Sequence, residues 1–428
     1  MGRESLRRVY EGFKALSPDG RSRMRAFHES RKASISELDD WTRSAPAMPV
    51  AAKRVLIDGM WDNANYWMRF AILRRALHLY SAHEVGVLGK HSRRIVRETF
   101  SGFGIDDLID LHALTKSRKK HLKRARQLLA ATKSSEEILS WSLPHDFPGT
   151  LVFDGILKRQ RRATLDLEDP LLPEYIAEAL AYIEAAYEIV SDANFDLVLV
   201  SHCVNYTYAA LAWAAFRNNI PVVVVYGSYG TVRFMRLSTE DDFFRYPGRP
   251  SKSEMINLPT AAARNLAKLG ALQIEGRLHG KTSDIGSLYA YKKRQTQIGR
   301  KELCTHYSWD PDKPTIGVYA SNWFDYPHGS GLESFLDFYD WIRVTLEVAS
   351  ERKDVNWMFK AHPCDDWYPE VQGPRLDQLV AQANVPHIKL AEKSWNGSDL
   401  IHCLDGFITC HGTIGIEAGC FGKPVLTA

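Results

Sequence analysis

The chain has 428 residues, of which 45% are hydrophobic and 25% charged, and its formal net charge is +4. This composition is typical of a globular protein long enough for two or three domains, and so small a charge gives no reason to expect a nucleic-acid partner. No apolar run reaches the roughly 18 residues that span a membrane, and the Arg-rich start lacks the apolar core of a signal peptide. We therefore expect a cytoplasmic protein.

Positive charge is concentrated in two segments. Residues 1–32 contain nine Arg and Lys against four Asp and Glu, and residues 116–126 read KSRKKHLKRAR. Such runs are typical of solvated helix faces, but they would also suit an anionic membrane surface. Peripheral contact with the inner face of the cell membrane is therefore an open alternative.

The six cysteines show neither a paired C-x-x-C spacing nor the density of a disulfide scaffold. We expect reduced thiols and no metal site, because no cluster of Cys and His has the spacing of metal ligands.

In chain order, residues 1–50 are predicted to form a polar helical extension. The first domain, residues 51–305 with helical insertions, then alternates apolar strand patterns with helical ones. The expected strands are 54–58, 84–88, 195–200 and 221–226, and the expected helices are 64–81 and 207–218. Alternation of this kind predicts a doubly wound parallel sheet, and therefore an α/β domain.

A second α/β domain is expected over residues 306–428. Its predicted strands are 315–320, 355–359, 387–390, 406–409 and 424–427, and a helix over 332–350 is expected to start from the glycines at 329 and 331. Because the sequence stops directly after a strand pattern, we expect the C-terminal end of this domain to be truncated.

Polar side chains follow two of these strands. Lys360-Ala-His362-Pro comes directly after strand 355–359, and His411-Gly412-Thr413 follows strand 406–409 and precedes a short helix. Open α/β sheets bind ligands at the carboxyl ends of their strands, and the amide groups of a helix start favour a phosphate. The loop after strand 315–320, which carries Asp325 and His328, is a further candidate for phosphate contact.

Together, KAHP at 360–363, DGFIT at 405–409 and EAGCFGKPV at 417–425 resemble the donor half of GT-B glycosyltransferases, within them the bacterial capsule and surface-polysaccharide group. The resemblance is dense over 315–428 and only architectural over 50–235. It implies two Rossmann-like domains facing a cleft. The implied activity is metal-independent transfer of a sugar from a nucleotide-sugar donor to a growing capsular or lipopolysaccharide glycan.

The resemblance also implies roles for single residues. It places His362 near the donor phosphate, as a catalytic residue, and Glu417 at the ribose hydroxyls. His411 departs from the Ser- or Asp-type motif of related transferases, which leaves the identity of the donor open. The full set of candidate donor-binding residues is Asp325, His328, Lys360, His362, His411, Gly412, Thr413 and Glu417. The nucleotide-sugar is the substrate, and no cofactor is expected.

Transfer to a hydroxyl also requires a base in the first domain. Asp58 and Asp62, in and after the first strand, are the candidates, although strand-end caps would look the same. The partner would be a glycan or lipid-linked acceptor. Its candidate binding residues are Asn63, Asn65, His202, Asn205, Tyr206 and Tyr229.

Three alternatives to a glycosyltransferase stay open. One is a polyol-phosphate transferase of the teichoic-acid type, and another is a sugar-nucleotide epimerase, which needs no acceptor. The third is an inactive GT-B-like scaffold that binds polysaccharide-assembly proteins. Dependence on an acceptor separates the two transferases from the epimerase, and loss of nucleotide affinity would mark the scaffold.

Overall fold

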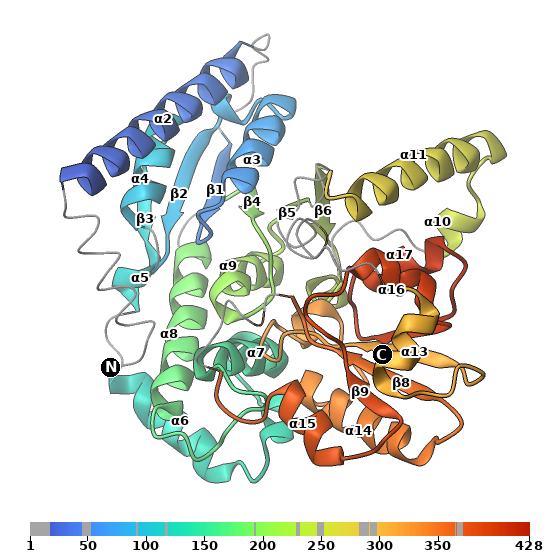
Figure 1. Ribbon diagram of the computed structural model, residues 1–428. Coiled ribbons are helices and arrows are strands. Elements are labelled where there is room, and N and C mark those ends of the chain that lie inside the picture. The colour runs from blue at the N-terminus through green and yellow to red at the C-terminus, as the bar shows by residue number, and fades with distance from the viewer. Residues whose placement is uncertain are drawn as a thin grey trace. The chain divides into compact units, whose positions relative to one another are not determined.

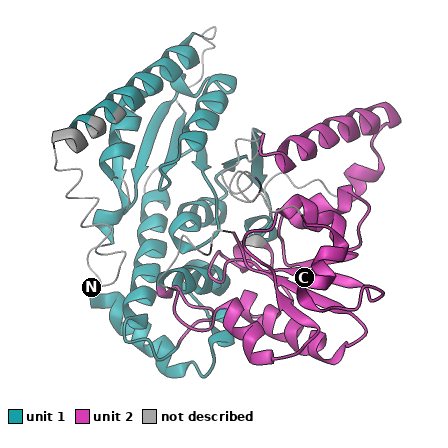
Figure 2. Cartoon of the chain, in the orientation of Figure 1, with its two compact units in different colours: residues 1–159, 167–227, 231–248 teal, residues 160–166, 228–230, 249–428 magenta. Residues whose placement is uncertain are grey.

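The structure is a computed structural model that describes residues 18–44, 53–90, 93–115, 119–191, 194–227, 232–245, 252–281, 291, 298–363, 365 and 371–428. The chain divides into two compact units (Figures 1 and 2). Unit 1 comprises residues 1–159, 167–227 and 231–248, and unit 2 comprises 160–166, 228–230 and 249–428.

This division differs from the predicted domain boundary at 305. Residues 249–305 belong to unit 2, because Leu278, Leu303 and Cys304 are part of its hydrophobic core. The predicted extension over residues 1–50 is likewise part of unit 1, where its helix buries Ile35 and Thr42.

The sheet of unit 1 has six strands in the order β3-β2-β1-β4-β5-β6. The strands are β1 (Arg54–Gly59), β2 (His83–Leu88), β3 (Leu108–Asp110), β4 (Leu197–Val200), β5 (Val222–Tyr226) and β6 (Arg233–Leu237). All pairings are parallel except that of β5 with β6. The four predicted strands are confirmed. Strands β3 and β6 were missed because β3 has only three residues and β6 is interrupted by two arginines. The winding reverses between β1 and β4, which makes this the switch point where such sheets bind ligands.

Helices flank this sheet (Figure 1). They are α2 (Pro18–Arg43), α3 (Ala64–Ala76), α4 (Arg93–Gly102), α5 (Leu111–Leu114), α6 (Lys119–Ala131), α7 (Gly149–Gln160), α8 (Leu172–Ser191) and α9 (Tyr206–Arg217). On α3 and α4, the rings of Trp67, Phe70 and Phe100 are fully buried and pack edge to face. Cations along α6 are exposed, and membrane contact through this helix stays a prediction.

Unit 2 has a five-stranded, wholly parallel sheet in the order β11-β10-β7-β8-β9. Its strands are β7 (Thr315–Tyr319), β8 (Asn356–Lys360), β9 (Ile388–Leu390), β10 (Gly406–Thr409) and β11 (Val425–Thr427). All five correspond to predicted strands, so the expectation of two doubly wound α/β domains is confirmed. The switch point of this sheet lies between β7 and β10. That the two domains face a cleft stays a prediction.

The helices of unit 2 include α10 (Lys252–Ile256), α11 (Thr260–Leu278), α13 (Arg300–Tyr307), α14 (Phe338–Glu351), α15 (Leu376–Ala383), α16 (Gly397–Cys403) and α17 (Ile414–Cys420). The helix predicted over 332–350 was placed too early. It begins at Phe338, because the Asp337 carboxylate caps it by accepting a hydrogen bond from Asp340 N at 2.9 Å. A 3₁₀ turn at His328–Ser330 precedes it instead.

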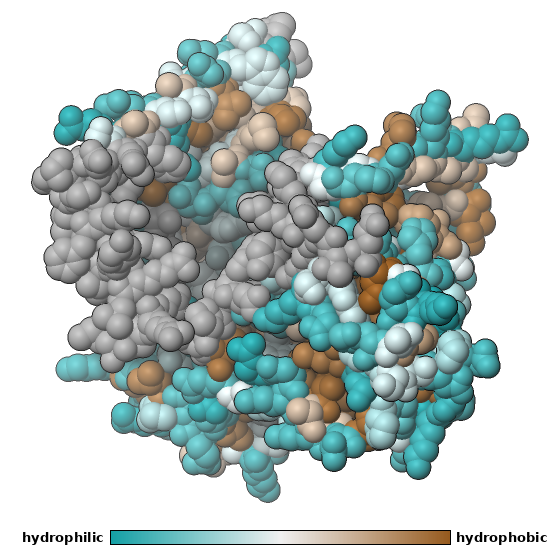
Figure 3. Space-filling model, viewed as in Figure 1, coloured by the Kyte–Doolittle hydropathy of each residue, from teal (hydrophilic) through white to brown (hydrophobic). Residues whose placement is uncertain are grey.

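Hydrophilic residues are interspersed with hydrophobic ones on the face drawn in Figure 3. Among the helices that the structure describes, none is both long and apolar enough to cross a membrane.

Candidate functional site

The Lys360-Ala-His362-Pro segment leaves the sheet of unit 2 where β8 ends. Trp357, Met358 and Phe359 are buried in the strand, and Pro363 cannot continue it. The backbone then turns, with Asp365 N donating to the carbonyl oxygen of His362 at 3.1 Å. The predicted strand-end position of Lys360 and His362 is confirmed.

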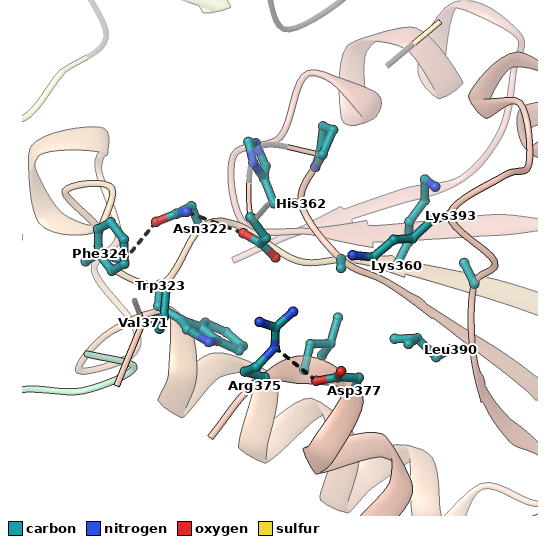
Figure 4. A pocket seen from close by; sticks show the side chains of 15 residues that line it. Asn322, Trp323, Phe324, Lys360, His362, Val371, Arg375, Asp377, Leu390 and Lys393 are labelled. Carbon is teal, nitrogen blue, oxygen red and sulfur yellow. Dashed lines mark hydrogen bonds and ion pairs between the residues drawn. The ribbon is translucent and has the colours of Figure 1, made fainter. Parts of the chain in front are cut away.

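A pocket lies at the carboxyl ends of β7, β8 and β9 (Figure 4). It is lined by Asn322, Trp323, Phe324, Lys360, Ala361, His362, Pro363, Asp365, Val371, Arg375, Leu376, Asp377, Leu390, Ala391 and Lys393. Its enclosed volume is about 70 Å³, several times the roughly 10–15 Å³ that one water requires. The enclosed part therefore suits a group the size of a phosphate better than a whole nucleotide.

Positive charge dominates this pocket. Lys360, Arg375 and Lys393 line it, against the carboxylates of Asp365 and Asp377. Arg375 Nε lies 3.5 Å from an oxygen of Asp377, and Figure 4 shows the Arg375 and Lys360 side chains directed into the same space. Three cations against two carboxylates leave a net attraction for an anion.

The pKa is lowered for both candidate imidazoles at these strand ends, the half-buried His362 and the exposed His411. Desolvation lowers the pKa of His362, and the nearby Asp325 opposes this shift. The pKa of His411 is also lowered, mainly by desolvation and further by His362, with Asp325 again opposing. The ring of His411 lies 4.9 Å from that of Phe338. Because both pKa values are below the ordinary 6.5, each neutral ring can donate one hydrogen bond and accept another near pH 7.

The polar residues after β10 form hydrogen bonds with other residues of unit 2. Gly412 N donates to Thr409 Oγ1 at 3.2 Å, and Thr413 Oγ1 accepts from Arg277 at 3.0 Å. Glu417, only 2% exposed, is paired with Arg277 and accepts a hydrogen bond from the Tyr291 hydroxyl. A ribose could reach this carboxylate only by displacing Arg277 or Tyr291. The structure therefore gives no support to ribose binding by Glu417.

Asp325 and His328 differ in their exposure to solvent. Asp325 is exposed, and its backbone N donates to the carbonyl of Asn322 at 3.1 Å. His328 is 6% exposed, in the 3₁₀ turn, and does not line the pocket. Neither residue lines the pocket, but Asp325 is close enough to His362 and His411 to influence the pKa of each imidazole.

In unit 1, Asp58 joins the two strands at the switch point. Its carboxylate accepts hydrogen bonds from Met60 N at 2.5 Å, Ser201 N at 3.1 Å and Ser201 Oγ at 2.9 Å. It is 1% exposed, and its pKa is raised, because desolvation by burial outweighs the hydrogen bonds from Met60 and Ser201 that lower it. An acceptor hydroxyl cannot reach so enclosed a carboxylate, which argues against Asp58 as the direct base.

Asp62 and the nearby asparagines occupy structural positions. The Asp62 carboxylate forms an ion pair with Arg31 of α2. Asn63 is the N-cap of α3, where its side chain accepts from Asn65 N at 2.9 Å, and Asn65 itself is exposed. Asn205 caps α9 in the same way, accepting from Thr207 N at 2.7 Å. Asn63 and Asn205 therefore serve as helix caps.

His202 is a predicted acceptor residue whose ring is held by aromatic neighbours. It is half-buried, and its ring lies 5.0 Å from that of Trp61 and 4.0 Å from that of Tyr208. Tyr206, by contrast, is 1% exposed, with its ring 6.1 Å from that of Tyr182 in the interior. Tyr229 lies outside the described residues.

Sequence reasoning missed several residues at both sites. Arg375 and Lys393 line the pocket, and Tyr208 stacks on His202. Applying the strand-end rule to β9 would have found Lys393, because it follows that strand by three residues. No local pattern marks Arg375 or Tyr208. Among the described residues, no group of three or more His, Cys, Asp and Glu is arranged to hold a metal ion.

No family model matches this chain, and no curated protein matches it. Similar solved structures include KpsC of Thermosulfurimonas dismutans, a beta Kdo 2,4 transferase, with 14% identity over 56% of this chain and 74% of that chain, at a TM-score of 0.33. A UDP-GlcNAc 2-epimerase from Neisseria meningitidis bound to UDP-GlcNAc is 15% identical over 88% and 82%, at 0.23. A glycosyltransferase from Rickettsia africae is 12% identical over 88% and 79%, at 0.25. TM-scores this low carry no inference about the activity of this chain.

Proposed function

We propose that this protein is a metal-independent glycosyltransferase that uses a nucleotide-sugar donor. Unit 2 would hold the donor phosphates at the pocket beside His362, and unit 1 would bind the glycan or lipid-linked acceptor. The observation that carries the proposal is the cationic, phosphate-sized pocket formed around the Lys360-Ala-His362-Pro turn. This turn is also central to the sequence resemblance.

The chemistry of transfer explains why such a pocket would be needed. As the sugar leaves the nucleotide, negative charge develops on a phosphate oxygen, and groups already oriented toward that oxygen stabilise the transition state. Lys360, Arg375 and Lys393 would supply positive charge. The neutral imidazole of His362 would supply a hydrogen-bond donor or a proton.

Direct binding measurements test the donor site. We expect one of UDP, GDP, CMP and CDP to bind selectively in calorimetric titrations. His362→Ala and Lys360→Gln should each weaken that nucleotide at least tenfold, about 1.4 kcal/mol. The matched variants His402→Ala and Lys301→Gln change exposed residues of unit 2 outside the pocket and should leave the affinity within about twofold. If the folded protein binds none of the four nucleotides, the proposal fails.

Product analysis separates the alternatives. A glycosyltransferase releases nucleotide only when an acceptor glycan is present, whereas an epimerase inverts a stereocentre of the sugar in the nucleotide-sugar without any acceptor. A polyol-phosphate transferase would release CMP while the polyol phosphate appears on the acceptor. Selective binding without turnover of any donor would favour the scaffold.

A further inference from the structure

A hydrogen-bonded chain of three side chains crosses the switch point of unit 1. Asp58 lies near the end of β1, and Ser201 and His202 directly follow β4. Ser201 Oγ lies 2.9 Å from an oxygen of Asp58 and 2.9 Å from His202 Nδ1. The chain therefore runs from a buried carboxylate, through a fully buried hydroxyl, to a half-buried imidazole.

The ionised form of Asp58 would place the proton of His202 on Nδ1. Both oxygens of Asp58 accept from backbone donors, Oδ1 from Met60 N and Oδ2 from Ser201 N, and these contacts favour the ionised form, whereas desolvation raises the pKa of this carboxyl. An ionised carboxylate has no proton to give, so the Ser201 hydroxyl donates to Asp58 and must accept from His202. The proton of His202 is then on Nδ1, and Nε2 carries the basic lone pair.

Aromatic neighbours hold the ring in place. Trp61 meets the His202 ring edge-on at 67°, and the Tyr208 ring is tilted by 31° relative to it. Desolvation raises the pKa of Tyr208 to about 12, with Asp58 adding to the shift, so that this phenol is neutral near pH 7. The imidazole is thus both oriented and supported by an acceptor for its Nδ1 proton.

We propose that His202 is the catalytic base of the acceptor site, and that Ser201 and Asp58 are positioning residues that hold it in the Nδ1–H form. This rests on the proposed function. It assigns the role of base to His202 in place of Asp58 and Asp62, which are enclosed or ion-paired.

The acceptor hydroxyl oxygen forms a bond to the anomeric carbon of the donor sugar, and the bond from that carbon to the phosphate oxygen breaks. The nucleotide leaves with the electron pair of that bond, and the hydroxyl proton moves to Nε2 of His202. The resulting imidazolium is stabilised by Nδ1–H donating to Ser201, which in turn donates to Asp58.

Nitrogen NMR on the histidine-labelled protein tests the hydrogen bonds between Asp58, Ser201 and His202 without any substrate. We expect the His202 signals, assigned by their loss in His202→Gln, to report the Nδ1–H tautomer at a pH where the ring is neutral. Ser201→Ala removes the acceptor of that proton while keeping the backbone N–H to Asp58, and should shift the ring toward the Nε2–H form. A wild-type ring in the Nε2–H form, or a tautomer unchanged in Ser201→Ala, would overturn the proposal.

Asp58→Asn is a second probe of the same chain. Its amide can donate to Ser201, so the hydroxyl would turn to donate to His202 and drive the ring into the Nε2–H form. Since this variant also costs a buried hydrogen bond, its fold must first be verified, and Ser201→Ala decides the question if it does not fold. Ser140→Ala removes an exposed serine hydroxyl elsewhere in unit 1 and should leave the tautomer unchanged.

Kinetics test the catalytic role. His202→Gln should lower acceptor-dependent kcat by about 10²–10⁴-fold, the usual contribution of a general base, while nucleotide affinity stays within about twofold. His83→Gln, an exposed histidine of the same unit, should leave both unchanged. An unchanged kcat in His202→Gln would refute the role of His202 as the catalytic base. Absence of nucleotide binding by the wild type would instead refute the proposed function, and the tautomer result would stand by itself.

Discussion

Two imidazoles with lowered pKa values, those of His362 and His411, lie at the carboxyl ends of the strands of unit 2. His362 follows β8 and His411 follows β10, with β7 between these two strands, and desolvation lowers the pKa of each imidazole below its ordinary value. A charged imidazole would bind a phosphate more strongly in the ground state. A neutral one can donate a hydrogen bond whose strength grows as the leaving group becomes more negative, which is the property that catalysis needs.

His411 should also make stability depend on pH. Its pKa is lowered in the folded protein, so as the pH falls below about 6.5 the unfolded chain binds a proton that the folded chain does not. The associated stability is complete above that pH and is lost as the pH falls through the folded-state pKa. We expect the wild type to lose more stability than His411→Gln between pH 7 and pH 5, measured as the urea midpoint.

The exposed histidine variant His83→Gln is the control for this comparison. It should follow the wild type across the same pH range. Equal losses in wild type and His411→Gln would show that His411 does not contribute to this pH dependence.

At the scale of elements, a buried ion network attaches helix α2 to the sheet of unit 1. Arg74 of α3 is 1% exposed and donates to Glu84 of β2 at 2.7 and 2.9 Å. It also pairs with Asp39 and donates to Thr42 at 3.1 Å, both on α2. One guanidinium thus links three elements, which explains how a helix of polar composition is fixed in place.

Removing that guanidinium should destabilise unit 1 strongly. Arg74→Met would leave the Glu84 carboxylate buried without its partner, and breaking a buried pair in this way typically costs about 3–5 kcal/mol. Arg94→Met breaks an exposed i,i+4 pair with Glu98 and should cost less than about 0.5 kcal/mol. Urea unfolding of both variants measures the difference. Similar losses of unfolding free energy in Arg74→Met and Arg94→Met would show that the buried network does not stabilise unit 1 more than an exposed ion pair does.

At the scale of the whole molecule, each unit has its own sheet and its own hydrophobic core. We therefore predict two unfolding transitions for the full chain. A nucleotide that binds unit 2 should raise the free energy of unfolding of that unit alone. The expected increase is about 2.7 kcal/mol at a nucleotide concentration 100 times its Kd.

Hydrogen exchange with mass spectrometry can assign these transitions. Peptides from β7, β8 and β10 should gain protection when nucleotide is added, and peptides from β1, β2 and β4 should not. A single transition that shifts as a whole, with protection gained equally in both units, would show that the units unfold together.

Both sheets could be predicted because parallel strands buried on two faces leave continuous apolar runs in the sequence. Residues 54–58 and 355–359 are of this kind, and the polar Lys360-Ala-His362-Pro turn is recognisable because it follows such a run directly. The two doubly wound units and the strand-end position of this turn were therefore predictable. The strands that were missed, β3 and β6, leave no such run, because β3 has only three residues and arginines interrupt β6.

The partners of individual side chains were not predictable, because they depend on which strand ends and helices the fold brings together. Asp58 and Ser201 are 143 positions apart and meet only since β1 and β4 are neighbours in the sheet. Glu417 is 140 positions from Arg277, and that pairing encloses a carboxylate that the sequence suggested for a ligand. Local patterns record burial and periodicity, whereas the register of strands and the docking of helices decide which polar groups are satisfied internally and which can meet a substrate.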